Sequence, residues 1–210
     1  MEYKLRGETL RLLSEKAIYW PKEKCLLVSD VHQGKIQHFR KFGLGVPNEA
    51  AKSNIHRLSQ IFDSYEISKV IFLGDLFHSS LNSEWQSFSK FRKGYKNIEF
   101  DLVMGNHDIL DEHSFSQAID NILPEGTCLG PFALFHHPSD KEGYYGLCGH
   151  IHPSLKIVNH SKQSVRVPCF YFGESFAILP AFGSFTGTHS IQAKKNDDIF
   201  LIVEDEVIQY

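Results

Sequence analysis

Short apolar runs alternate with segments of helical periodicity in the first half of the chain. The runs Lys24–Ser29, Lys69–Leu73 and Glu99–Met104 consist mostly of apolar residues, a pattern typical of strands buried on both faces. From Asn48 onward, apolar residues recur at helical spacing, and asparagine is a favourable N-cap residue. A second helix is predicted over Ser83–Arg92. The order β-α-β-α-β indicates parallel strands joined by helical crossovers.

Strands dominate the rest of the chain. Two short strands, Thr9–Leu13 and Ala17–Trp20, precede the first buried run, and a helix is predicted over Ser114–Ile122, before Pro124. We therefore expect an α/β fold in which a parallel sheet continues into antiparallel strands. Apolar segments separated by Gly, Pro, Asn and Ser predict the later strands at Phe132–Phe135, Tyr144–Cys148, Leu155–Val158, Ser164–Val167, Ser175–Leu179, Ile199–Val203 and Val207–Tyr210.

Length and charge narrow the class of protein. The 210 residues predict one domain over positions 1–210. A formal net charge of −3 excludes a strongly basic nucleic-acid binder, but it does not exclude a substrate that carries phosphate. The sequence has no apolar run long enough for a transmembrane helix and no signal-peptide pattern, so we expect a cytoplasmic protein without membrane attachment.

Cysteines and clustered aromatic residues are assigned to the core. The four cysteines form no C-x-x-C pair and lie in apolar stretches, which predicts reduced, buried thiols and argues against a cysteine zinc site. Base stacking would require exposed rings beside a basic groove, so a core role is favoured for the aromatic cluster as well. That cluster is Phe170–Phe172, Phe176, Phe182 and Phe185.

Potential metal ligands follow one predicted strand after another. Ligand sites in α/β sheets lie beyond the carboxyl ends of the strands, so these side chains should converge at one edge of the sheet. In the segments 30–32 and 150–152 the polar residues are two positions apart, and an extended chain points both to the same side. The set is Asp30, His32, Asp75, Asn106, His136, His150 and His152, with His107 and Asp108 directly after Asn106.

The donor atoms in this set are oxygen and nitrogen only. Carboxylates, an amide and imidazoles without thiolates suit manganese, iron or zinc in an open catalytic site. Seven ligands are too many for one ion, and a carboxylate can bridge two. Two ions about 3.5–4 Å apart form the arrangement that clamps a phosphoryl group and generates a hydroxide nucleophile.

The ordered motifs resemble those of the calcineurin-like metallophosphoesterases. They are Asp30-Val31-His32, Gly74-Asp75, Gly105-Asn106-His107-Asp108, His136 and Gly149-His150-Ile151-His152. A finer likeness, to the small bacterial DNA ligase-associated metallophosphoesterases, is carried by SDVHQGKIQHFRKFGLGVP (Ser29–Pro47), LGDLFHS (Leu73–Ser79) and LPAFGSFTG (Leu179–Gly187). The resemblance implies two packed mixed β-sheets flanked by helices, a four-layer sandwich.

The resemblance also implies a role for each motif residue. One ion would be held by Asp30, His32 and His152, the other by Asn106, His136 and His150, with Asp75 bridging them. His107 would reach the substrate as an acid or electrostatic stabiliser, oriented by Asp108, and metal-bound hydroxide would attack phosphorus. The fifth motif reads His136-His137-Pro138 where many relatives have His-Gly. We assign His136 as the ligand, and His137 stays the alternative.

The predicted function is that of a phosphoesterase with two divalent ions, for which manganese is the first choice and iron or zinc are the alternatives. We expect a phosphodiesterase with a link to nucleic-acid processing or repair, with Arg40 and His78 contacting the substrate. Competing hypotheses are a phosphomonoesterase, a nucleotide pyrophosphatase, and a catalytically weak binding module that recruits DNA-repair proteins such as a DNA ligase or helicase. Both a monomer and a homodimer are compatible with the sequence.

Overall fold

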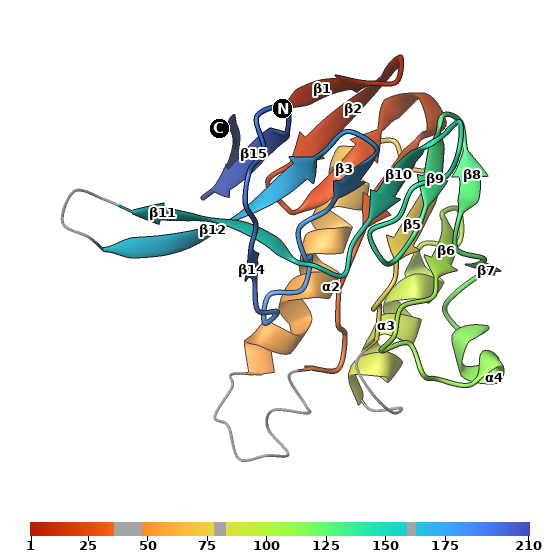
Figure 1. The fold of residues 1–210 in the computed structure, drawn as a ribbon. Coiled ribbons are helices and arrows are strands. Elements are labelled where there is room, and N and C mark those ends of the chain that lie inside the picture. Colours follow the sequence, from red (N-terminus) through yellow and green to blue (C-terminus); the bar gives the residue numbers. More distant parts are fainter. Residues whose placement is uncertain (36–47, 78–82, 159–162) are drawn as a thin grey trace.

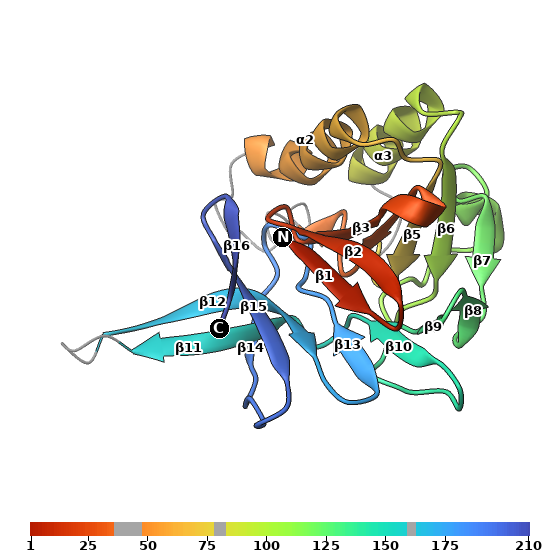
Figure 2. The same cartoon turned by 90° about the horizontal axis from the view of Figure 1, so that it is seen from above.

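The computed structural model describes residues 1–35, 48–77, 83–158 and 163–210. Two mixed β-sheets pack face to face, and helices cover one side of the pair (Figures 1 and 2). This architecture confirms the predicted α/β fold of two packed mixed sheets. The helices of the described residues cover the first sheet only, so three layers are present where the resemblance implies four. Within the described part of the chain, no helix combines the length and the apolar character that a membrane span requires.

The first sheet has seven strands in the order of the sequence. The strands from β1 to β4 are antiparallel, whereas β4 to β7 run parallel. The β-α-β-α-β pattern predicts the parallel order of β4, β5 and β6. The parallel strands therefore place their carboxyl ends at one edge. The bounds are β1 (Glu2–Leu5), β2 (Glu8–Leu13), β3 (Ala17–Trp20), β4 (Cys25–Val28), β5 (Lys69–Leu73), β6 (Glu99–Val103) and β7 (Asn121–Leu123).

Two helices form the parallel crossovers and cover the outer face of this sheet (Figure 2). They are α2 (Asn48–Ser64) and α3 (Ser83–Gly94). Leu58 of α2 and Phe88 of α3 are fully buried in one apolar cluster with Phe72 and Phe100 of the sheet. Two further elements are single turns, the 3-10 helix η1 (Pro21–Glu23) and α4 (Glu112–Phe115).

The second sheet has nine strands, built from the later half of the chain. Its central strand β10 lies parallel to both β9 and β13. Strands β11 and β12 form a long antiparallel hairpin that extends beyond the body of the molecule (Figures 1 and 2). The bounds are β8 (Thr127–Leu129), β9 (Phe132–Leu134), β10 (Tyr145–Cys148), β11 (Pro153–Val158), β12 (Ser164–Phe172), β13 (Phe176–Ile178), β14 (His189–Ser190), β15 (Asp198–Val203) and β16 (Glu206–Gln209).

The apolar core between the two sheets explains why the first-sheet strands are apolar on both faces. Leu27, Ile71 and Val103 face the second sheet and pack in one cluster with Phe132 and Leu147. The residues that alternate with them along each strand face the helices instead. Each of these strands therefore contributes side chains to both cores. Full burial of each such side chain stabilises the fold by about 1.5–3 kcal/mol. Packing in both cores holds in place the strand ends that carry the polar motifs.

Three sequence predictions are corrected by the structure. The helix predicted over Ser114–Ile122 is wrong: α4 is one turn, and residues 121–123 form β7, because this short run gains hydrogen bonds as the parallel neighbour of β6. Cys128 is exposed, whereas the other three cysteines are buried, and all four are free. Phe185 is 41% exposed, unlike the fully buried Phe182.

Candidate metal centre

The predicted ligands meet at the carboxyl ends of strands from both sheets. Asp30 and Asp75 lie just beyond β4 and β5, and His136 and His150 lie just beyond β9 and β10. Three overlapping groups have ligand atoms within 4.8 Å of one another: Asp30 with His32 and His152; Asp30 with Asp75 and His136; and His136 with His137 and His150. Asn106 joins them through its Oδ1, 3.1 Å from His136 Nε2. Arg40 and His78 lie outside the described residues.

The pair of Asp30 and His152 fits a bound cation. His152 Nδ1 lies 3.0 Å from the carbonyl oxygen of Gly187. A carbonyl can only accept a hydrogen bond, so Nδ1 carries the proton and Nε2 of the neutral ring presents a lone pair. That Nε2 lies 3.1 Å from Asp30 Oδ1, and neither buried atom has a hydrogen-bond partner among the described residues. A lone pair facing a buried carboxylate oxygen is the environment of a metal ligand pair.

His136 has the same arrangement on the other side of the site, with Nδ1 facing a carbonyl oxygen. Its ring is fully buried, and its Nδ1 donates to the carbonyl oxygen of Leu73 at 3.0 Å. Nε2 is therefore the free acceptor of the neutral ring. It lies 3.1 Å from Asn106 Oδ1, 3.1 Å from His150 Nδ1 and 3.5 Å from Asp75 Oδ1. Donor atoms of this kind are drawn together by a shared proton or a shared cation.

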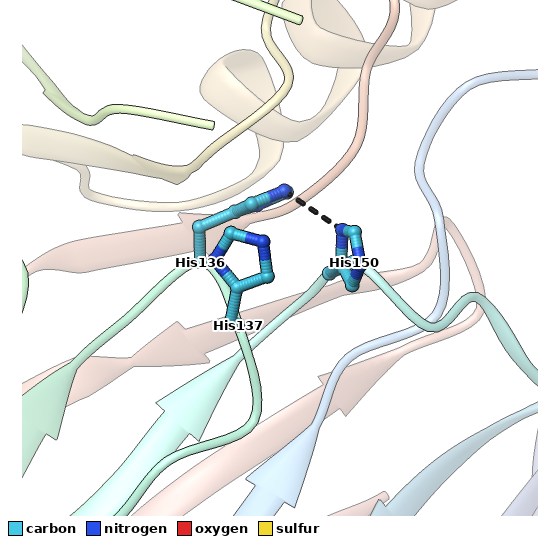
Figure 3. A group of neighbouring side chains, drawn as sticks. All are labelled: His136, His137 and His150. Carbon is cyan, nitrogen blue, oxygen red and sulfur yellow. Dashed lines mark hydrogen bonds between the residues drawn. The ribbon is translucent and has the colours of Figure 1, made fainter. Parts of the chain in front are cut away.

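His137 and His150 differ in burial and in partners. Figure 3 shows that His136, His137 and His150 converge, with His136 bonded to His150. Burial, followed by the neighbouring histidines, lowers the pKa of His150, which favours the neutral ring that binds metal. The His137 side chain is half exposed, and its Nδ1 lies 3.5 Å from Glu125 Oε1. The buried His136 thus faces Asp75, whereas His137 lies at the rim.

Asp75 lies between the two groups of histidines. Its Oδ1 is 3.5 Å from His136 Nε2 and accepts the main-chain N–H of His107 at 2.9 Å. Its Oδ2 is 3.8 Å from His32 Nε2 on the opposite side. The carboxylate is almost completely buried. Its two oxygens therefore point toward different ligand groups, which is the arrangement that a bridging carboxylate requires.

Five of the seven predicted ligands have a backbone conformation that their residue types rarely adopt. Their φ angles are 52° for Asp30, 48° for His32, 50° for Asp75, 68° for His150 and 54° for His152. A left-handed non-glycine residue costs about 1–2 kcal/mol, and such residues concentrate at functional sites. The expectation of an extended chain at 30–32 and 150–152 is therefore wrong, and His150 groups with His136 whereas His152 groups with Asp30. The sequence carries no direct signal for it, since none of these residues is glycine.

The glycines of the motifs provide the space that the ligands occupy. A Cβ atom on Gly74 would lie 2.0 Å from His136 Nδ1. A Cβ on Gly105 would lie 2.3 Å from Asp75 Oδ1, and one on Gly149 would lie 2.5 Å from Asp30 Oδ2. Each glycine therefore allows a ligand from another strand to approach the main chain closely.

His107 and Asp108 extend the site toward the surface. The His107 ring is exposed, and its centroid lies 5.4 Å from that of His32. Asp108 is buried and accepts the main-chain N–H groups of Phe77 and Gly105, both at 2.9 Å. Burial raises the pKa of Asp108 to about 7. Through these two hydrogen bonds, Asp108 holds the loop that carries His107 and Asn106.

A family model now adds to this geometry. The model described as calcineurin-like phosphoesterase matches residues 24–205, which include every predicted ligand. The chain belongs to the calcineurin-like phosphoesterases. As a member of this family, it is a metal-dependent hydrolase that acts on phosphate esters.

One solved structure agrees with this assignment. The calcineurin-like phosphoesterase is similar to a crystal structure of the Pseudomonas putida nuclease MPE, with 30% sequence identity and a TM-score of 0.83. The match covers 100% of this chain and 99% of the nuclease. A protein of unknown function from Aquifex aeolicus is 20% identical over 61% of this chain and 77% of its own, with a TM-score of 0.44, too low to support an argument. No curated protein sequence matches the chain.

Proposed function

We propose that this phosphoesterase is a phosphodiesterase that uses two divalent ions to hydrolyse nucleic-acid strands. The observation that carries the proposal is the position of Asp75, whose two carboxylate oxygens face His136 and His32 on opposite sides. The full-length similarity to a nuclease supports a phosphodiester substrate. Residues 1–210 act as one domain in this proposal, because strands from both halves share the core between the sheets.

The ligands divide into two sets around Asp75. Asp30, His32 and His152 hold one ion, and Asn106, His136 and His150 hold the other. Their lone-pair contacts and their imidazole, amide and carboxylate donors fit manganese, with iron or zinc as alternatives. When bound, two such ions neutralise phosphate oxygens and lower the pKa of water. His137 lies at the rim, where it contacts the substrate or the rings of His136 and His150.

The remaining polar residues act on the substrate. The exposed ring of His107 lies beside His32, within reach of a phosphate at the centre. Its main-chain N–H is held by Asp75, so its position is coupled to that of the bridging carboxylate. His107 donates a hydrogen bond to a phosphate oxygen or a proton to the leaving oxygen. Asp108 is a positioning residue that fixes this loop through two main-chain hydrogen bonds.

Hydrolysis of bis-p-nitrophenyl phosphate and of p-nitrophenyl phosphate, measured side by side, tests the proposal. Metal-stripped protein is assayed with manganese, zinc or ferrous iron, and an Asp75→Ala variant is the blank. We expect metal-dependent turnover that prefers the diester and is lost in the variant. Preference for the monoester would reject the diesterase assignment, and metal binding without turnover would favour a binding module for DNA-repair partners. A variant with normal turnover would reject the bridging role.

A further inference from the structure

The hairpin formed by β11 and β12, called the arm below, begins directly beside the metal centre. Its first residue, Pro153, follows the predicted ligand His152. The register pairs Ser154 with Pro168 and Val158 with Ser164. Within the described chain, β14 pairs with the arm only at Pro153–Ser154, and β13 and β15 pair with β12 only from residue 169 onward. The outer part of the arm is therefore a two-stranded ribbon (Figure 1).

Two positive charges face each other across this ribbon. Lys156 and Arg166 are directly paired in the register, and both are exposed. Like charges directly opposite one another destabilise a strand pair. Neither side chain has an ion-pair partner among the described residues. The pair thus carries an unfavourable repulsion that no described acidic group relieves.

The sequence around the arm is depleted of acidic residues. No Asp or Glu occurs from Gly143 to Gly173, although the chain contains 25 acidic residues and has a net charge of −3. Charges on exposed edge strands also prevent aggregation. A pair of opposite charges would also keep the edge charged, and it would stabilise the strand pair. A cationic pair in an acid-free segment therefore points to an anionic ligand.

We propose that the arm binds the phosphate backbone of a nucleic-acid strand whose reacting phosphate lies at the metal centre, an inference that rests on the proposed phosphodiesterase function. Lys156 is four residues beyond His152, or about 13 Å at about 3.3 Å per residue. A polymer spans this distance and a small ester does not. The arm therefore favours long substrates without touching the reacting groups.

Salt-dependent binding of a polynucleotide tests the arm apart from catalysis. The probe is a fluorescent phosphorothioate oligothymidylate, whose anisotropy is followed with metal-loaded full-length protein. The variant is Lys156→Gln with Arg166→Gln. Removing two phosphate contacts should make the slope of log affinity against log salt shallower by about 1.4, and weaken binding at least about tenfold at 0.1 M salt. Turnover of bis-p-nitrophenyl phosphate should stay at the wild-type rate.

A matched control removes the same charge elsewhere. Lys93 and Lys96 are exposed and precede β6, at the opposite end of the sheet from the metal centre. The variant Lys93→Gln with Lys96→Gln should keep the wild-type salt slope. Equal losses in both double variants would reduce the effect to net charge and overturn the proposal. Unchanged affinity in the arm variant would also overturn the proposal. If light scattering then showed a change in oligomeric state, the arm would be a contact between copies of the chain.

The two proposals fail in different ways. A wild-type protein that binds the oligonucleotide through the arm but hydrolyses no phosphate ester would reject the phosphodiesterase and keep the arm. A wild-type protein that hydrolyses the small diester but does not bind the oligonucleotide would reject the arm and the nucleic-acid substrate, and would keep the metal-dependent phosphodiesterase.

Discussion

Replacing Gly74 by alanine would separate backbone strain from damage to the metal centre. Gly74 has a φ of +80°, and the added Cβ would lie 2.0 Å from His136 Nδ1. A left-handed alanine costs about 1–2 kcal/mol. Overpacking against a buried ring adds about 1–3 kcal/mol, so the total is about 2–5 kcal/mol if His136 keeps its place. If the ring moves instead, its hydrogen bond to Leu73 and its position as a ligand are lost.

Gly7 provides the matched control for this substitution. It has nearly the same φ, +83°, but no heavy atom lies within 4 Å of an added Cβ. Gly7→Ala should therefore lower the free energy of unfolding by the backbone cost alone, about 1–2 kcal/mol. Urea titration measures both variants, and elemental analysis counts the bound metal. If Gly74→Ala lost no more stability than Gly7→Ala and kept its full metal content, the close approach of His136 to residue 74 would be refuted.

Two further predictions concern the metal centre, and a third concerns the buried Lys16. Asp75→Asn should lose bound metal and activity, whereas Asp101→Asn, which alters an equally buried carboxylate bonded to Asn121 and Lys69, should keep both; equal metal loss would count against the bridging role. His107→Ala should keep its metal but lose about 10²–10⁴ in turnover, so metal loss would make it a ligand. Burial lowers the pKa of Lys16 to about 8, so its charged form is disfavoured in the folded state. The stability of wild type relative to Lys16→Met should therefore rise between about pH 8 and 10.5 in thermal unfolding, and a constant difference would contradict this.

The sequence was informative wherever the signal is local. Apolar runs identify β4, β5 and β6, because these strands are buried on both faces. It failed at β7, where Asn121–Leu123 is too short for a periodicity and its strand conformation depends on β6. The polar motifs predicted which residues gather at the strand ends. They could not predict the exposure of Phe185, since the same residue type at position 182 is buried.

The left-handed conformation of five predicted ligands could not be predicted from the sequence either. Its cost explains why the site needs support from the apolar cores on both faces of the first sheet. At about 1–2 kcal/mol each, five such residues cost about 5–10 kcal/mol, which approaches the whole stability of a typical domain, about 5–15 kcal/mol. Hydrogen bonds beyond the strand ends offset part of this cost, since Asp30 N–H donates to Gly74 and His32 N–H donates to Asp75. The rest must come from the apolar cores that anchor β4 and β5 on both faces. Core substitutions such as Ile71→Ala should therefore weaken metal binding as well as folding, because the strained loops depend on these cores for the part of the cost that their hydrogen bonds do not offset.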